Sequence, residues 1–475
     1  MSFLGILYWL SRLIAIAAII HVVLDNRQPA KTMAWALVIY FIPIVGVILY
    51  LFFGINYRKE RFISRRSMDM LTKRSMLEFV EQRDLKLPAN HEPTVELFAN
   101  QSFSLPFING KTDILTSGYE FFPLLLHDIA QAQSHIHLDM YIFEDDALGQ
   151  LVADALIAKA RQGVEVRVIY DDVGCWRVKN SFFERMRQEG IDVEPFMPVR
   201  FPQFTSKANY RNHRKVIVID GHTGYIGGMN IALRYVKGPK VRSGSATSWR
   251  DTMLRLEGGG VNGLQRAFLI DWFFVDRTLL SDRKYYTKPE EEGGLVQTVT
   301  SGPVSAYPEI MQGYVRTILA AKEYVYLETP YFLPTDAVFF ALKTAAASDV
   351  DVRILVPRHC DARFVEWASR SYLREAAEAG IQVSLYEAGF LHSKLLVSDD
   401  EVCTCGSTNV DFRSFENNFE SNAFFYDTEL AIRMRQVFLA DEQLSVPLAS
   451  IPGRMQPKTA QRLWDSFTRL LSPLL

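Results

Sequence analysis

The sequence predicts an α/β protein of two similar halves, packed with pseudo-two-fold symmetry and preceded by an N-terminal transmembrane helical hairpin. Three observations predict this architecture. Two long apolar stretches lie within the first 54 residues. Strand-like and helix-like segments alternate from about residue 109 onward, which is the α/β pattern. Landmarks of the first half then recur in the second half in the same order, which indicates a duplicated domain.

The N-terminal region is interpreted as a two-helix membrane anchor over residues 1–57. Residues 33–53 form a run of 21 residues without a charged side chain, long enough to span the apolar core of a bilayer. Residues 4–24 are nearly as apolar, with Arg12 and His21 inside the run. A cleaved signal peptide is disfavoured because no charge precedes this run. Pro43 and Gly46 are expected to kink the second helix, which membrane helices tolerate.

A basic juxtamembrane linker is predicted over residues 58–108. Its first part contains seven cations: Arg58, Lys59, Arg61, Arg65, Arg66, Lys73 and Arg74. Only Arg27 and Lys31 lie in the turn between the two apolar runs, so the positive-inside rule places the C-terminal part in the cytoplasm. The cluster fits contact with anionic headgroups and a purely topological signal equally well.

Composition narrows the class of protein. A chain of 475 residues exceeds one typical domain, and a net charge of −2 excludes a polyanion-binding molecule as a whole. The cysteines, Cys175, Cys360, Cys403 and Cys405, lack the spacing of a metal site. Reduced thiols are therefore expected, in keeping with a cytoplasmic location for most of the chain.

The repeat is clearest in strand-like segments. Residues 134–143 and 164–172 are predicted as strands around a helix over residues 147–162. Residues 323–332 and 350–357 repeat the two strands, and VEVRV of the first half matches VDVRI of the second. We place the first half at residues 109–288 and the second at residues 289–475.

Each half then carries the same polar motif, in HRKVIVID and HSKLLVSD. The matching residues are His213, Lys215 and Asp220 in the first half and His392, Lys394 and Asp399 in the second. Side chains alternate along a strand, so the His and Lys of each motif point the same way. Each Asp is expected at the strand end, fixing the turn or pairing with a cation. Small residues and an amide that can contact a ligand follow both motifs, including Asn230, Ser407 and Asn409.

Two histidines and two lysines brought together can transfer a phosphoryl group. The lysines neutralise non-bridging phosphate oxygens, a neutral imidazole can attack phosphorus, and a protonated imidazole can donate to the leaving alkoxide. Structural histidines are disfavoured because the spacing is identical on matching repeats. No carboxylate cluster suited to a metal accompanies the motifs, so no metal and no cofactor are expected.

The motifs and their flanks resemble the phospholipase D superfamily and, within it, bacterial cardiolipin synthases. The resemblance rests on YRNHRKVIVIDG, on GSTNVDFRSFENNFESNAFFYD and on the hairpin RQPAKTMAWALVIYFIPIVGVILYLFFG, and it covers almost the whole chain. It implies two phospholipase D-like halves with the active site between them. It also implies that Glu420 orients His213 as nucleophile and that Asp251 orients His392 as general acid. Met253 stands where many members have a histidine, so no third histidine is implied.

The resemblance implies transfer of a phosphatidyl group between two phosphatidylglycerol molecules, giving cardiolipin and glycerol through a phosphohistidine. Phosphatidylglycerol and an anionic phospholipid bilayer are the implied partners. The implied location is the bacterial cytoplasmic (inner) membrane. A hydrolase releasing phosphatidic acid would use the same residues and is the alternative. A nuclease is disfavoured by the membrane hairpin and the near-neutral charge, so no nucleic acid is expected, and intact motifs disfavour a non-catalytic scaffold.

The C-terminal residues 458–471 have apolar side chains at helical spacing: Leu463, Trp464, Phe467, Leu470 and Leu471. This pattern is more typical of a helix docked on the core through its apolar face than of a helix lying on a membrane surface.

Overall fold

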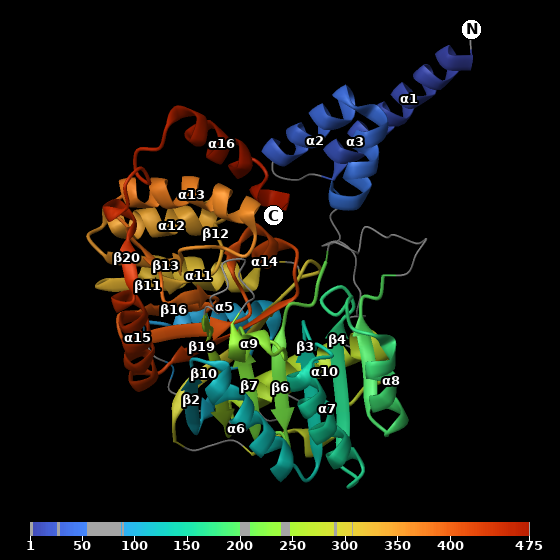
Figure 1. The fold of residues 1–475 in the computed structure, drawn as a ribbon, viewed down its shortest axis with the longest axis vertical. Coiled ribbons are helices and arrows are strands. Elements are labelled where there is room, and N and C mark those ends of the chain that lie inside the picture. Colours follow the sequence, from blue (N-terminus) through green and yellow to red (C-terminus); the bar gives the residue numbers. More distant parts are fainter. Residues whose placement is uncertain are drawn as a thin grey trace.

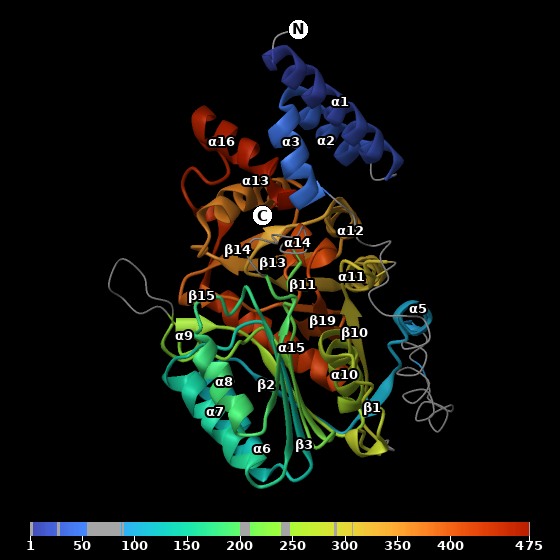
Figure 2. The same ribbon diagram turned by 90° about the vertical axis from the view of Figure 1, so that its right-hand side faces the viewer.

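A computed structural model describes residues 3–25, 29–54, 87, 90–199, 210–238, 248–288, 292–305 and 307–474. Two mixed β-sheets with flanking helices form the body of the protein, one in each half (Figure 1). The sheets confirm the prediction of two similar α/β halves. The N-terminal helices lie at one end of this body (Figure 2).

The first half contains a seven-stranded sheet. Its spatial order is β2 (Lys111–Leu115), β9 (Met253–Glu257), β7 (Thr223–Gly227), β6 (Lys215–Ile219), β3 (His135–Met140), β4 (Glu165–Asp171) and β5 (Asp192–Phe196). The strands β3, β4 and β5 are parallel, and the remaining pairs are antiparallel. One face packs against α6 (Gly118–Gln131), α7 (Ala147–Ala160) and α8 (Asn180–Gln188). The helix α10 (Val261–Asp276) contributes to separate apolar clusters with other strand residues.

The second half repeats this order in a nine-stranded sheet. The corresponding strands are β10 (Gly294–Ser301), β19 (Glu420–Tyr426), β17 (Val402–Gly406), β16 (Leu395–Ser398), β11 (Tyr324–Glu328), β13 (Asp351–Pro357) and β14 (Gln382–Tyr386). Two edge strands are added, β1 (Phe107–Asn109) and β20 (Ser445–Pro447). The helices α11 (Glu309–Ala320), α12 (Asp336–Ala347) and α13 (Arg363–Glu378) cover one face, and α15 (Thr428–Gln443) packs with the other.

Buried apolar clusters span the two halves. Val216 and Val218 of β6 pack in the same buried cluster as Leu395 and Val397 of β16. Two short pairings also cross between the halves: β8 (Ser248–Arg250) runs parallel to β15 (Gly389–Leu391), and a bridge joins Asn212 to Phe419. This packing brings together the two central strands that follow the His-x-Lys segments.

The chain crosses between the sheets before the first half begins. The helix α5 (Glu92–Ser102) packs on the second half, where the rings of Phe98 and Phe424 lie 4.8 Å apart. β1 then pairs with β10, and after Gly110 the chain continues as β2 in the other sheet. The seven cations of the predicted linker lie outside the described residues.

The N-terminal region contains one long helix and a divided second segment. Helix α1 (Phe3–Leu24) has a stretch of 20 residues, Gly5–Leu24, that is long and apolar enough to cross a membrane. The second segment forms α2 (Pro29–Phe41), α3 (Pro43–Leu49) and a π-helical turn, η1 (Tyr50–Gly54). The prediction of one kinked helix over residues 33–53 is therefore wrong.

Two residues explain the division. Pro43 has no N–H for the helix ladder and restricts the residue before it, and Ile42 leaves the helical conformation with φ −128° and ψ 70°. Gly46 then lets α3 fold back on α2, because a Cβ there would lie 2.7 Å from the carbonyl oxygen of Val38.

Candidate active site

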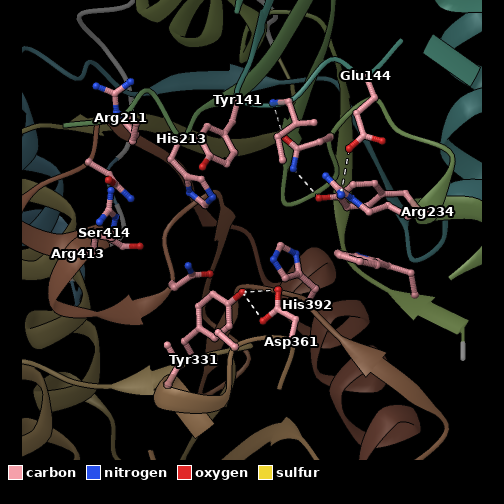
Figure 3. Close-up of a pocket in the computed structure, with 18 of the residues that line it drawn as sticks. Tyr141, Glu144, Arg211, His213, Arg234, Tyr331, Asp361, His392, Arg413 and Ser414 are labelled. Atoms are coloured by element: carbon pink, nitrogen blue, oxygen red, sulfur yellow. Dashed lines mark hydrogen bonds and ion pairs between the residues drawn. The ribbon is translucent and has the colours of Figure 1, made fainter. Parts of the chain in front are cut away.

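The two His-x-Lys segments meet at a cavity between the halves. His213 lies two residues before β6, and His392 lies three residues before β16. Both histidines line an open cavity of ≈ 1310 Å³. Figure 3 shows them across the cavity from one another, each supplied by a different half.

A carboxylate of the second half holds His213. Its Nδ1–H donates to Glu420, at 3.0 Å from Oε1 and 3.1 Å from Oε2. Glu420 is the first residue of β19 and is fully buried. Ser407 and Asn418 also donate hydrogen bonds to the oxygens of Glu420, and these bonds hold the carboxylate in the orientation that contacts the His213 ring. The contact at Nδ1 leaves Nε2 as the ring nitrogen available to a ligand.

His392 is held in the equivalent way, by a carboxylate of the first half. Its Nδ1–H donates to Oδ2 of Asp251 at 2.6 Å, and Asp251 follows β8 of the first half. Oδ1 of Asp251 accepts from the backbone N–H of Thr252 at 2.8 Å. The structure thus brings each implied carboxylate onto the histidine of the opposite half.

The lysines lie beneath the histidines and are buried. Nζ of Lys215 donates to the carbonyl oxygen of His213 at 2.5 Å, and Lys394 makes the same contact with His392. The ring of Tyr141 covers the first pair: its centroid lies 5.1 Å from Nζ of Lys215 and 4.8 Å from the ring of His213. In each motif, the hydrogen bond from the lysine to the backbone of the histidine therefore fixes the positions of the two residues relative to each other.

Burial shifts the protonation of these groups. It lowers the pKa of His213 to about 4, although Glu420 acts in the opposite direction. It lowers the pKa of Lys215 to about 7, and it lowers the pKa values of His392 and Lys394 as well. With a pKa of about 4, the imidazole of His213 is neutral at pH 7 and can act as a nucleophile.

The pKa values of the two carboxylates are also lowered, which for an acid favours the charged form. Burial alone would raise the pKa of Glu420, but His213 and Lys215 together lower it below its usual value. Lys394 and His392 do the same to the pKa of Asp251. Both acids therefore remain charged and can stabilise an imidazolium as it forms.

The aspartates of the motifs do not line the cavity. Asp220 accepts from the backbone N–H groups of residues 133, 134 and 135, at 2.8, 2.7 and 3.0 Å. Asp399 accepts from those of residues 322, 323 and 324, at 2.7, 3.0 and 2.8 Å. Each carboxylate ties the end of its strand to the start of the neighbouring strand, β3 or β11.

The small residues after the motifs take different positions. Asn230 and Asn409 line the cavity, whereas Ser407 reaches the site through Glu420. Asn230 accepts from the backbone N–H of Ile142 at 3.0 Å and donates to the hydroxyl of Tyr235 at 2.5 Å.

Sequence reasoning missed the arginines of the cavity. Arg234 and Arg413 each lie four residues after the asparagine of their half, so the repeat itself carried this signal. Figure 3 shows Arg413 on the side of His213 and Arg234 on the opposite side, where it pairs with Glu144 at 3.1 Å. Positive side chains therefore border both ends of the cavity.

Sequence reasoning also missed a buried ion pair under each motif. Arg214 pairs with Asp271 and donates to the carbonyl oxygen of Glu420, and Arg250 pairs with Asp441 at 2.7 Å. The first pair links the motif segment of His213 to α10, and the second links the end of β8, next to Asp251, to α15. Within the described ranges, no group of three or more His, Cys, Asp or Glu side chains is placed to hold a metal ion.

Known proteins match this chain over nearly its whole length. The family described as "Cardiolipin synthase, PLD-like domain" matches residues 125–238 and 314–442, and a phospholipase D-nuclease N-terminal family matches residues 13–54. The cardiolipin synthase of Geobacillus thermodenitrificans is 40% identical over 461 residues, which is 95% of this chain and 90% of that protein. This chain belongs to the cardiolipin synthase family.

A second relative and a solved structure are similar to this chain over most of its length. The major cardiolipin synthase of Bacillus subtilis is 36% identical, with 96% of each chain covered. The crystal structure of a phosphatidylserine synthase from Haemophilus influenzae covers 81% of this chain and 100% of its own, with a TM-score of 0.63 and 16% identity. That likeness concerns the fold alone. Membership in the cardiolipin synthase family makes this chain a phosphatidyltransferase of the phospholipase D type.

Proposed function

We propose that this protein transfers a phosphatidyl group between two phosphatidylglycerol molecules through a phosphohistidine on His213, giving cardiolipin and glycerol. One observation carries the proposal. Two histidines, each with a buried carboxylate of the opposite half on Nδ1, border one cavity with a buried lysine beneath each. These groups are sufficient for two successive in-line displacements at one phosphorus atom.

In the first displacement, Nε2 of His213 attacks phosphorus. The bond from phosphorus to the glycerol oxygen breaks, and His392 gives its Nε2 proton to that oxygen; Asp251 and the negative phosphate of the bound substrate favour the protonated form of His392, against the effect of burial. Glycerol leaves. The phosphatidyl group is then bonded to Nε2 of His213, and His392 is neutral. Glu420 stabilises the positive charge that develops on the ring of His213.

The second displacement reverses these roles. Neutral His392 removes a proton from a hydroxyl of the second phosphatidylglycerol, and that oxygen attacks phosphorus. The bond from phosphorus to Nε2 of His213 breaks, which releases cardiolipin and regenerates neutral His213. Lys215 and Lys394 neutralise the phosphate oxygens in both steps, where a preorganised donor contributes roughly 10²–10³ in rate.

The arginines of the cavity and the apolar N-terminal helices support a lipid substrate and a membrane location. Arginines at both ends of the cavity suit an anionic headgroup. We assign α1 and the divided second segment to the membrane anchor of a bacterial cytoplasmic (inner) membrane protein, with both halves on the cytoplasmic side. Both substrates are membrane lipids, so this anchor keeps the cavity near them.

Product analysis tests the proposal. The purified protein, in detergent with phosphatidylglycerol as the sole lipid, should form cardiolipin and glycerol in equal amounts. Phosphatidic acid as the only lipid product would show hydrolysis instead and would contradict the proposal. His213→Ala should abolish both products. The matched control is His127→Ala, at an exposed position on α6, and it should retain full activity.

A further inference from the structure

The C-terminal helix α16 (Thr459–Arg469) is packed with its polar side inward. Asp465 and Thr468 are fully buried, and the carboxylate of Asp465 pairs with Arg374 of α13 at 2.7 Å. Leu463 and Leu470 are 72% and 75% exposed, although they are the more apolar residues. A helix docked on a core has the opposite orientation. The expectation that this helix docks through its apolar face is therefore wrong.

The exposed side chains of α16 continue onto α13. The ring centroids of Trp464 and Trp367 lie 5.6 Å apart, and those of Trp367 and Phe364 lie 5.3 Å apart. We call this surface the α13/α16 face; its residues are Phe364, Trp367, Leu463, Trp464, Phe467 and Leu470. Contiguous exposed apolar surface of this kind marks an interaction site rather than ordinary protein surface.

The α13/α16 face begins beside the active-site cavity. Ala362 and Val365, at the start of α13, line that cavity, and Phe364 in the same turn is 51% exposed. A partner that covers this face therefore also lies beside the part of the cavity wall that α13 forms.

Charge and position indicate what the partner is. Exposed cations flank the apolar residues: Arg363, Lys458 and Arg462. Tryptophan and phenylalanine next to Lys and Arg are typical of a helix at the interface of an anionic membrane. Figures 1 and 2 both show α13 and α16 at the end of the molecule where the apolar helices α1 to α3 lie, with α6 and α7 at the other end.

We propose that the α13/α16 face docks on the surface of an anionic phospholipid bilayer. The apolar side chains enter the headgroup region, and the flanking cations remain at phosphate level. The start of α13, which lines the cavity, then lies against the lipid surface, so a lipid has a short path from the bilayer to the cavity. This docking does not depend on which phosphatidyl transfer the cavity catalyses.

Spin labels on the full chain test where the face lies. Leu463→Cys would be labelled in a Cys360→Ser background, since the other three cysteines are buried. After reconstitution into bilayers of phosphatidylglycerol and phosphatidylcholine, the label should become accessible to oxygen and protected from a water-soluble nickel complex. The matched label at Leu151→Cys, 51% exposed on α7, should remain accessible to the nickel complex.

Two results would overturn docking. A Leu463 label that remains accessible to the nickel complex in bilayers leaves the face in water. A label shielded from both reagents, in detergent as well as in bilayers, means that a second copy or another part of this chain covers the face.

Activity provides a second readout on the same proposal. The triple variant Leu463→Gln, Phe467→Gln and Leu470→Gln removes apolar side chains without touching the cavity. Its kcat/KM on phosphatidylglycerol vesicles should fall about tenfold or more, with its activity in mixed detergent micelles retained. The control Leu151→Gln with Leu319→Gln changes exposed leucines on α7 and α11 and should leave both activities unchanged. Equal activity of the triple variant and this control on vesicles would overturn the proposal.

Discussion

Replacing Asp220 by Asn tests whether the aspartate of the motif acts on the fold or on the chemistry. Its carboxylate accepts from three backbone N–H groups, two at Oδ1 and one at Oδ2. The amide of Asn can retain the two bonds at Oδ1, but its NH₂ group then faces the N–H of Gln133. Asn also tolerates the positive φ of 53° at this position, so the substitution adds little backbone strain of its own.

The expected cost follows from these contacts. A hydrogen bond to a charged group contributes roughly 1.5–3 kcal/mol, and an opposed donor adds a further penalty. We expect Asp220→Asn to lower the free energy of unfolding by about 2–4 kcal/mol. For a domain the size of one half of this protein, a loss of this free energy corresponds to a fall in Tm of roughly 4–16 °C. Asp399→Asn should behave alike, because Asp399 makes the equivalent three contacts.

The assay compares thermal unfolding in detergent with kcat per folded molecule. Asp220→Asn should lower Tm and leave kcat of the folded enzyme within roughly twofold of the wild-type value, since Asp220 does not line the cavity. Asp349→Asn is the matched control, an exposed residue with a positive φ of 62°. A fall in kcat of a hundredfold or more at unchanged Tm would refute the reasoning and place Asp220 in the reaction itself.

Three further predictions concern the cavity. Glu420→Gln should lower kcat by about 10²–10⁴ with the fold intact by circular dichroism, because the ring of His213 loses its orienting charge; unchanged kcat contradicts this, and the exposed Glu429→Gln is its control. In a pH profile, kcat/KM of the free enzyme should fall below a pH of about 4 as His213 gains a proton, and it should fall on the basic side as His392, whose pKa is lowered, and Lys215, with a pKa of about 7, lose theirs. An acid limb near the ordinary histidine pKa would argue against a buried neutral His213. Excess chelator should leave activity unchanged; a loss that Mg²⁺ or Zn²⁺ restores would show a metal requirement.

Much of the fold was predictable because the sequence repeats itself. The segments VEVRV and VDVRI form β4 and β13, which occupy equivalent places in sheets of the same strand order. Alternating strand and helix signals need only local sequence. The division of the second apolar segment could not be predicted from local sequence, because it depends on α3 folding back over α2 at Gly46. That contact is tertiary, and the local pattern around Pro43 predicts only a kink.

The site was predictable in unequal parts. The His-x-Lys spacing identified both histidines, but the carboxylates at their Nδ1 atoms lie 207 and 141 residues away along the chain. No local pattern joins such residues, so only the family resemblance pointed to them. For α16, helical spacing predicted which side is apolar. It could not predict which side meets the protein, because the pair of Arg374 with Asp465 decides the orientation.

The division of labour between the two histidines is the central claim. An acid is needed when the leaving group is a poor one such as glycerol, whereas p-nitrophenol leaves without a proton. His392→Ala should therefore be nearly inactive on phosphatidylglycerol yet release p-nitrophenol from a phosphatidyl-p-nitrophenol. His213→Ala should be inactive on both substrates, because no covalent intermediate can form.

Mass spectrometry of the trapped intermediate tests this claim most directly. After His392→Ala reacts with phosphatidyl-p-nitrophenol, the phosphatidyl group should be found on the peptide that carries His213. A phosphatidyl group on His392 in the His213→Ala variant, with that variant the one that releases p-nitrophenol, would contradict the assignment.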